Sequence, residues 1–292
     1  LSWGAVLNAT EDNSAGTVTV TTVGVEDGQT LTITLNGATY TGSVSSNSVT
    51  VTITAAGLQA LTDGSSYTLT ADVSDAAGNA ATQLTSSAFT VDKSAPSINA
   101  IATSALSWGA VLNATEDNSA GTVAVTTVGV ENGQSVTITL NGATYTGSVS
   151  SNSASVTISA SGLQALTDGS SYTLTADVSD AAGNAATQLT SSAFTVDKSA
   201  PSINAIATSA LSWGAVLNAT EDNSAGTVTV TTVGVEDGQT LTITLNGDTY
   251  TGSVSSNSVT VTITAAGLQA LTDGQSYTCL LYTSPSPRDT IR

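Results

Sequence analysis

Carboxylates are the only ionisable side chains that are common in this chain. The sequence has 22 Asp and Glu residues against four Lys and Arg, with no His, no Met and a single Cys. Because this cysteine, Cys279, lies in a C-terminal tail, the repeated part of the sequence lacks the imidazoles and thiolates that act as bases, nucleophiles and soft-metal ligands. A net charge of −18 argues against nucleic-acid and anionic-membrane partners, and no apolar run is long enough for membrane insertion. The remaining partner for clustered carboxylates is a cation.

The acidic residues recur with the rest of the sequence at a period of 105 residues. Leu-Ser-Trp-Gly-Ala-Val-Leu-Asn begins at Leu1, Leu106 and Leu211. Residues 1–105 and 106–210 differ at eight positions, and residues 1–68 and 211–278 differ at two. Any site must occur in each copy, so the repeat favours a mechanical or multivalent protein and not an enzyme.

Each unit has the length of a domain with its own core. We therefore expect separate domains arranged in tandem. They are a repeat at residues 1–96 that lacks its first strand, a complete repeat at 97–201 and a truncated repeat at 202–278, followed by a non-native tail at 279–292. The tail, which contains Cys279, leaves the repeat register in the middle of a strand. Asp92-Lys-Ser-Ala-Pro96 and its copy at 197–201 are short linkers stiffened by proline.

Alternation of β-branched apolar residues with threonine predicts an all-β fold. Asn36-Gly37 predicts a two-residue hairpin, and residues 55–61 predict a single helical turn. We expect seven strands, at residues 98–102, 17–23, 31–35, 39–44, 49–54, 67–73 and 86–91. Seven short strands in about 100 residues are typical of a β-sandwich.

Asp63 precedes Tyr67 by four residues, in a pattern that resembles the tyrosine corner of immunoglobulin-like domains. The tyrosine hydroxyl is then expected to form a hydrogen bond with nearby backbone. Leu69 stands where antibody domains have their second cysteine, so apolar packing replaces the disulfide. The predicted architecture is tandem seven-stranded Ig-like β-sandwiches.

The repeat as a whole resembles the bacterial Ig-like tandem repeats of large surface adhesins of the biofilm-associated and RTX type. The resembling segments cover nearly all of residues 1–278 and are 7–11, 24–29, 35–37, 58–64, 72–79 and the Asp-Lys-Ser-Ala-Pro linker. The resemblance implies extracellular spacer domains that are secreted unfolded and are often stiffened by calcium.

In such a sandwich the loops gather at two poles, and nearly all the acids lie in loops. We expect Asn8, Glu11 and Asp12 to lie near Asp92 at one pole, facing the opposite pole of the next repeat across the linker. Calcium takes about six to eight oxygen ligands from carboxylates, amides and carbonyls. Our hypothesis is that Ca²⁺ binds at these poles and junctions. The candidate ligands are Asn8, Glu11, Asp12, Asp72, Asp75, Asn79, Asp92, Asn113, Glu116, Asp117, Glu131, Asp177, Asp180, Asn184, Asp197, Asn218, Glu221 and Asp222.

Each candidate also has a structural interpretation, because Asp and Asn favour turns. We assign Asp63 to the corner turn and expect Lys93 and Lys198 to be solvated. Trp3 and its copies can pack in the core or at a junction, or, if exposed, stack on sugars.

The leading functional prediction is an extracellular spacer or stalk segment of a bacterial surface adhesin, whose partners are the neighbouring repeats of the same chain. The alternative is a multivalent module that binds a surface glycan or protein weakly in each repeat and gains avidity. We expect no catalytic residues.

Overall fold

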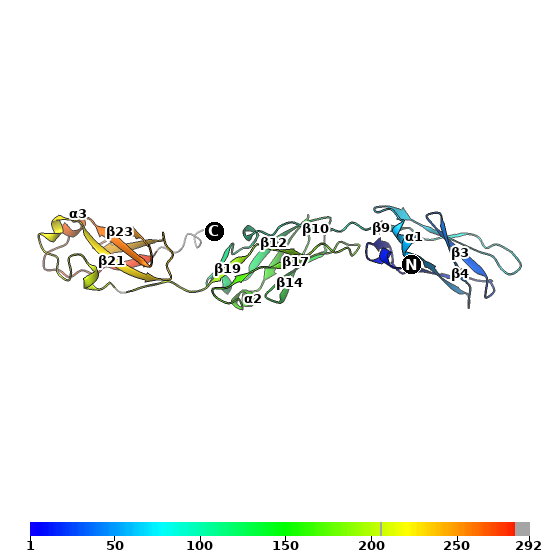
Figure 1. Ribbon diagram of the computed structural model, residues 1–292, viewed down its shortest axis with the longest axis horizontal. Helices are drawn as coiled ribbons and strands as arrows, with labels where there is room; N and C mark the ends of the chain where they lie inside the picture. The colour runs from blue at the N-terminus through cyan, green and yellow to red at the C-terminus, as the bar shows by residue number, and fades with distance from the viewer. Residues whose placement is uncertain (205, 284–292) are drawn as a thin grey trace. The chain divides into compact units, whose positions relative to one another are not determined.

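The computed structural model describes residues 1–204 and 206–283, and short β-strands dominate it (Figure 1). The chain divides into two compact units. The first, Leu1–Lys198, holds the first and second repeats, and the second holds the third repeat from Ser199 onward. Each repeat has its own cluster of buried apolar side chains, as expected of separate cores.

The second repeat has the fullest set of elements. They are β10 (Ser97–Ile98), η2 (Thr103–Ala105), β11 (Val111–Asn113), η3 (Glu116–Asn118), β12 (Gly121–Val128), β13 (Ser135–Leu140), β14 (Ala143–Ser148), β15 (Ser153–Ile158), α2 (Ala160–Gln164), β16 (Ser171–Tyr172), β17 (Thr175–Asp177), β18 (Leu189–Thr190) and β19 (Phe194–Asp197).

The first repeat follows the same order of elements, but without a counterpart of β10 and η2. Its elements are β1 (Val6–Asn8), η1 (Glu11–Asn13), β2 (Gly16–Thr21), β3 (Thr30–Leu35), β4 (Ala38–Ser43), β5 (Ser48–Ile53), α1 (Ala55–Gln59), β6 (Ser66–Tyr67), β7 (Leu69–Val73), β8 (Leu84–Thr85) and β9 (Phe89–Asp92). The third repeat contains β20 (Ser202–Ile203), η4 (Thr208–Ala210), η5 (Glu221–Asn223), β21 (Gly226–Val233), β22 (Thr240–Leu245), β23 (Asp248–Ser253), β24 (Ser258–Ile263), α3 (Ala265–Gln269) and β25 (Leu280–Thr283).

Two sheets form the sandwich of the second repeat, with strand orders β10-β12-β15 and β14-β13-β17-β18. A third small sheet, β11-β19-β16, closes one pole. The residues of β12 alternate strictly between buried and exposed, with Val123 and Val125 buried as the sequence pattern predicts; at the end of the strand the types reverse, and Thr127 is buried while Val128 is exposed. The predicted all-β immunoglobulin-like sandwich is confirmed.

The Asn-Gly hairpin is confirmed in each repeat. Leu35 pairs with Ala38, so Asn36 and Gly37 form the whole turn, with φ of 47° and 80°. Positive φ at both central residues matches the twist of the flanking strands. The predicted helical turn is also present, and the Thr54 hydroxyl caps it by accepting a hydrogen bond from the Gly57 amide.

The last two expected strands differ from the prediction. The strand expected at residues 67–73 divides between two sheets, because residues 66–67 pair with β9 while residues 69–73 pair with β3. Of the strand expected at residues 86–91 only the part from Phe89 is present, in β9, which pairs with β1 and β6; the separate strand β8 lies before it and pairs with β7. The short strand β1, which lies parallel to β9, was not predicted. Three residues are too few for an alternation signal.

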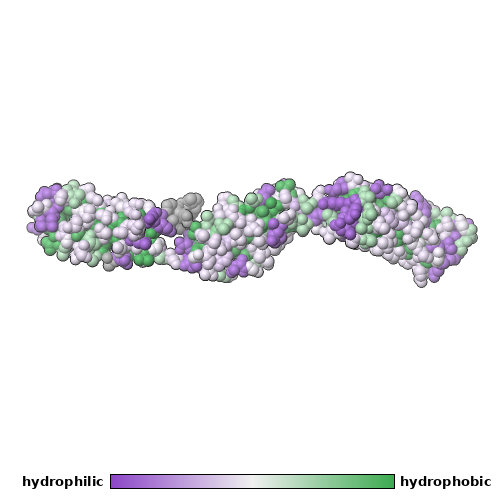
Figure 2. Space-filling view, viewed as in Figure 1, coloured by the Kyte–Doolittle hydropathy of each residue, from purple (hydrophilic) through white to green (hydrophobic). Residues whose placement is uncertain are grey.

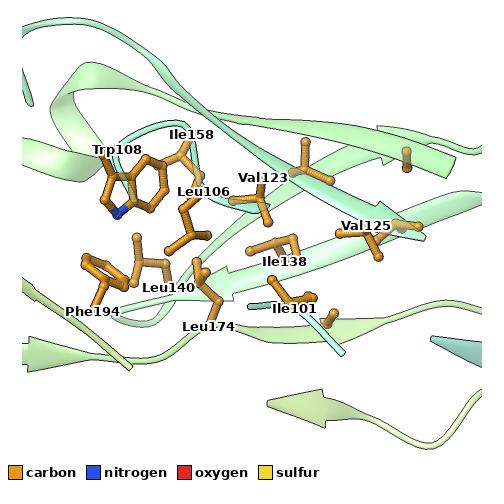
Figure 3. Packing of buried hydrophobic residues seen from close by; sticks show 14 of the residues in the cluster. Ile101, Leu106, Trp108, Val123, Val125, Ile138, Leu140, Ile158, Leu174 and Phe194 are labelled. Carbon is orange, nitrogen blue, oxygen red and sulfur yellow. The ribbon is translucent and has the colours of Figure 1, made fainter. Parts of the chain in front are cut away.

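Trp108 lies in the core of its repeat (Figure 3), as does Trp3 in its own, and each is 5% exposed. The Trp108 ring meets Phe194 edge to face, with ring centroids 5.4 Å apart. This confirms the core packing predicted for the tryptophan. The predicted tyrosine corner is present as well, because the Tyr172 hydroxyl accepts a hydrogen bond from the Thr167 amide at 3.0 Å.

The tail differs in part from its prediction. Strand β25 pairs with β22 in the register that β7 has with β3, so Ile243 lies opposite Leu281 as Ile33 lies opposite Ala71. The strand therefore continues beyond Thr278, because hydrogen bonding by backbone tolerates the changed side chains. Burial raises the pKa of Cys279, which stands where the first repeat has the core residue Leu69. Residues 284–292 lie outside the described chain, and the non-native origin of the tail stays a prediction.

Replacement of Gly121 by alanine tests the packing of Trp108. A Cβ at Gly121 would lie 2.6 Å from Cζ3 of Trp108, which is too close for the ring to stay in place. We expect Gly121→Ala to lower the free energy of unfolding by about 1–3 kcal/mol. Urea denaturation of the full chain measures this, and the loss should shrink in a Trp108→Leu background. An equal loss in both backgrounds would contradict the steric explanation.

Candidate functional site

Parallel pairing of β1 with β9 brings the beginning and the end of the first repeat to one pole. Asn8 lies opposite Asp92 in this pairing, as the sequence predicted. The Asn8 side-chain oxygen accepts hydrogen bonds from the amides of Thr10 and Glu11, and the Glu11 carboxylate accepts one from the Asn8 amide. These local bonds hold the acidic loop rigidly beside Asp92.

The facing pole of the second repeat is a tight turn between Asp180 and Asn184. The Asp180 carboxylate accepts hydrogen bonds from both the backbone and the side-chain amide of Asn184, at 2.8 and 2.9 Å. Glu131, from the loop after β12, accepts a hydrogen bond from the Ala181 amide at 2.8 Å. Two carboxylates from different loops therefore hold one turn.

Asn184 joins the two repeats. Its side-chain oxygen accepts a hydrogen bond from the Ala9 amide, and its side-chain amide donates to the Asp92 carbonyl, both at 2.9 Å. The Asn184 side-chain amide also approaches the Asp92 carboxylate at 3.5 Å.

A second direct contact completes the junction. Asn8 donates a hydrogen bond across it to the Ala182 carbonyl at 2.9 Å. Five of the candidate ligands therefore lie at this junction. Four of them are linked by these hydrogen bonds, and Glu131 is near enough to act electrostatically on Asp92; the five are Asn8, Asp92, Glu131, Asp180 and Asn184.

Burial separates this turn from its copy in the first repeat. Asp180 and Asn184 are 4% and 3% exposed, whereas Asn79 in the first repeat is exposed. Asp75 and Asn79 form the same internal hydrogen bonds, but the described chain places no repeat against them. The sequence of the turn is the same in both repeats, so the neighbour makes the difference.

The ionised carboxylate of Asp92 is in an unfavourable environment at the junction. Desolvation raises its pKa above the ordinary value of 3.8, and the negative charges of Asp180, Asp63 and Glu131 raise it further. The hydrogen bond from the Ser94 amide opposes this rise in pKa. Nearby negative charges disfavour an ionised carboxylate, and a cation would reverse that effect.

Asp12 belongs to a different arrangement, in which Lys93 is its partner. The Lys93 ammonium lies 2.8 Å from Asp12 and donates to the carbonyls of Leu58, Gln59 and Leu61 at the end of α1. Lys198 and Asp117 repeat the ion pair at 2.9 Å. The lysines are therefore not solvated as expected. Their partners are more than 30 residues away, so no local sequence signal could reveal them.

Asp63 also binds the linker. Its carboxylate accepts hydrogen bonds from the Gly64 and Lys93 amides and from the Ser94 hydroxyl. The bond from Ser94, followed by that from the Lys93 amide, lowers the pKa of Asp63. The assignment of Asp63 to the corner turn therefore describes only part of its contacts.

The other candidate ligands occupy three kinds of position. Asp72 and Asp177 lie on strands, where they accept hydrogen bonds from Gln83 and Gln188 respectively. At the far pole of the second repeat, Asn113 lies opposite Asp197 and binds Glu116. In the third repeat, Asn218 and Glu221 form the same local turn, in which Asp222 also lies.

The donor chemistry suits a hard cation, since the junction offers carboxylate, amide and carbonyl oxygens. Among the residues that the structure describes, no group of three or more acidic side chains is close enough to hold a metal ion as it stands. Strongly hydrophilic side chains gather in patches, between which the visible surface is pale with smaller hydrophobic areas (Figure 2). No helix within residues 1–204 and 206–283 is long and apolar enough to cross a membrane.

Replacement of Lys93 by methionine tests the structural role of the lysine. It leaves Asp12 and the ends of α1 without their donor, so we expect a loss of about 1.5–3 kcal/mol in the free energy of unfolding. Chemical denaturation of the Lys93→Met, Asp12→Leu and double variants gives the coupling between the two side chains. Additive losses would show that the ion pair contributes nothing.

Whereas Lys93 is expected to stabilise the folded chain, the raised pKa of Asp92 predicts that its ionised carboxylate destabilises the junction. The folded protein holds a proton on Asp92 more tightly than the unfolded chain does. In a buffer with EGTA, the contribution of Asp92 to stability therefore falls as pH rises from 3.8 through the raised pKa. Asp92→Asn should remove this contribution and stabilise the chain at neutral pH. Urea denaturation of both chains between pH 3.5 and 7 measures it, and parallel pH profiles would refute it.

Comparison with known proteins places this chain among bacterial adhesins. No protein-family model matches the chain, and no curated protein matches it. A solved Ca²⁺-stabilized adhesin, which helps an Antarctic bacterium reach out and bind ice, is 30% identical over 96% of this chain and 70% of that one, with a TM-score of 0.45.

Two further structures are similar. A 1.5-MDa bacterial ice-binding adhesin is 28% identical over 97% of this chain and 89% of that one, with a TM-score of 0.45. A bacterial immunoglobulin-like domain from the M. primoryensis ice-binding adhesin is 33% identical over 35% of this chain and 95% of that one, with a TM-score of 0.26. The 30% sequence identity to the Ca²⁺-stabilized adhesin extends across nearly the whole chain. On that identity, this chain belongs to the family of bacterial immunoglobulin-like repeats of large adhesins.

Proposed function

We propose that this chain is an extracellular spacer segment of a bacterial surface adhesin, and that Ca²⁺ bound at the poles stiffens the junctions between its repeats. The supporting observation is the junction of the first two repeats. There Asp180 and Asn184 are buried only because a neighbouring repeat covers them, and the pKa of Asp92 is raised by other carboxylates.

At this junction Asp92, Asp180 and Glu131 supply the negative charge, while Asn184 and the Ala182 and Asp92 carbonyls supply neutral oxygens. Calcium bound there relieves the repulsion between carboxylates that come from two repeats, and therefore stabilises their contact. Two carboxylates about 5 Å apart repel by roughly 1–3 kcal/mol at effective dielectric constants of 80 to 20. A relative described as a Ca²⁺-stabilized adhesin supports the choice of ion.

Repetition suits a spacer because each unit adds length without a new site. An eight-residue strand such as β12 spans about 27 Å at about 3.4 Å per residue. None of the three tryptophans is exposed. They therefore do not offer the sugar-stacking surface that a multivalent glycan-binding module would use. The secreted location in a biofilm-forming bacterium is part of this same proposal.

Calcium should raise the melting temperature of the chain. At 100 times its Kd, one ion that binds only the folded state adds about 2.7 kcal/mol to the free energy of unfolding. Scanning calorimetry with calcium and with EGTA measures this for three chains: the unchanged chain, Asp180→Asn, and Asp75→Asn as the matched control. Asp180→Asn should lose most of the calcium effect, whereas Asp75→Asn, in a turn with no neighbouring repeat, should keep it.

Two results would refute calcium at the junction. One is an unchanged melting temperature in EGTA together with no bound metal in the purified chain. The other is an equal loss of the calcium effect in both variants, which would place the ion in the turn of a single repeat. Small-angle scattering in calcium and in EGTA then tests the stiffening itself, because a spacer that depends on the ion should become more flexible without it.

A further inference from the structure

The two linkers between repeats carry the only lysines in the chain. Lys93 and Lys198 occupy the same position in the first and second repeats, and the only arginines, Arg288 and Arg292, belong to the tail. A protease that cuts after lysine or arginine therefore finds a single recognition residue in each of these two repeats, at its boundary with the next. Cleavage after both lysines would release the second repeat as one piece.

The chain that follows Lys93 is open to solvent, but the lysine side chain is not. Ser94 and Ala95 are exposed. Exposed linkers with small residues are the usual sites of proteolytic cleavage. The side chain of Lys93, however, is only 18% exposed. A trypsin-type protease must take this side chain into its own specificity pocket, so the fold withholds the recognition residue from such a protease.

Four acceptors hold the Lys93 ammonium within its own repeat. The Asp12 carboxylate lies 2.8 Å away, and the carbonyls of Leu58, Gln59 and Leu61 accept hydrogen bonds at 3.3, 3.2 and 3.0 Å. An ammonium has three donors, so these acceptors satisfy it completely. Departure of the lysine would leave the Asp12 side chain, which is 9% exposed, without its cation. Hydrogen bonds between charged groups are the strongest in proteins, and departure is therefore costly.

The backbone on both sides of the Lys93–Ser94 bond is also held. The Lys93 amide and the Ser94 hydroxyl both donate to the Asp63 carboxylate at 2.6 Å, and the Ser94 amide donates to the Asp92 carboxylate at 3.2 Å. An extended peptide is recognised through free backbone groups as well as through its side chains. A protease would therefore have to break these bonds, in addition to the ion pair, before the linker could enter its active site.

The second repeat contains the same arrangement. Lys198 lies 2.9 Å from Asp117 and donates to three carbonyls at and just after the end of α2, while its amide donates to Asp168 at 2.7 Å. None of the eight substitutions between the two copies falls on these residues. The two linkers are thus protected in the same way.

We propose that the Lys93–Ser94 and Lys198–Ser199 bonds are latent cleavage sites for a protease that recognises lysine, each kept closed by the ion pair within its repeat. Hydrolysis breaks the bond between the lysine carbonyl carbon and the serine nitrogen. Water supplies the hydroxyl of the new carboxyl group and the proton of the new amine. The site opens when the lysine leaves its carboxylate, as it must when the repeat unfolds. An unfolded repeat is then cut from the next one, while a folded repeat stays joined.

Digestion of the full chain by a lysine-specific endoproteinase tests the protection. Mass spectrometry of the products gives the rate of cleavage after each lysine separately. A synthetic peptide with the sequence of residues 90–99 gives the rate for the same bond without the fold. We expect the bond in the folded chain to be cut at least about a hundredfold more slowly than in the peptide, because only the rare open state is cleaved. Equal rates would overturn the proposal.

Replacement of Asp12 by asparagine tests the ion pair, because it removes the charge and keeps the size of the side chain. Cleavage after Lys93 should become at least about fivefold faster, and cleavage after Lys198 should keep its rate. Asp117→Asn should have the reverse effect. An unchanged rate after Lys93 in Asp12→Asn would overturn the ion pair as the restraint. All digestions are done in EGTA, so the outcome is independent of the calcium proposed at the junction.

A second protease separates release of the lysine from unfolding of the whole repeat. Chymotrypsin cuts after aromatic residues, and Phe89 is 1% exposed in the core of the first repeat. Chymotryptic cleavage after Phe89 should stay as slow in Asp12→Asn as in the unchanged chain, and an increase equal to that after Lys93 would overturn the specific role of the ion pair. Asp27→Asn is the matched control and should change neither rate, since Asn132 accepts the same backbone hydrogen bond in the second repeat.

Discussion

The parallel pairing of β1 with β9 is the constraint on which the rest of the structure depends. It places Asn8 beside Asp92, so the start of a repeat and the start of its linker share one pole. The linker then turns back onto the same repeat, where Lys93 reaches Asp12 and the end of α1, and Asp63 holds Ser94. The next repeat therefore meets a surface already organised by its neighbour. At this pole Asp92 comes under the negative charge of Asp180 and Glu131 from the next repeat.

The acidic side chains at the poles have two kinds of electrostatic surroundings. Of the described acids, Asp12 and Asp117 form ion pairs with linker lysines, which supply a permanent cation. Asp92 instead faces Asp180 across the junction, where desolvation and then the negative charge of Asp180 raise the pKa of Asp92. A permanent cation fixes the linker to its own repeat. An exchangeable cation beside Asp92 would make the contact between repeats depend on the ions in the surrounding medium.

Near-identical sequences acquire different surfaces from their neighbours. The turn at Asp180–Asn184 is buried, while the same turn at Asp75–Asn79 borders solvent. This difference in burial arises from contact with the neighbouring repeat and not from any of the eight substitutions between the two copies. Contact between tandem repeats thus changes the burial of a turn without a change in its sequence.

Local patterns in the sequence determined the sandwich, the Asn36-Gly37 hairpin, the tyrosine corner and the gathering of acids in loops, because each depends on residues close together in the chain. They also predicted that Asn8 would meet Asp92, since strand order alone sets that pole. Only the tertiary structure decided that Lys93 pairs with Asp12, that Asn184 bridges two repeats, and that residues 66–73 divide between the sheets of β9 and β3. These features depend on contacts between residues 23 to 175 positions apart, whose geometry comes from packing and leaves no periodic trace in the sequence.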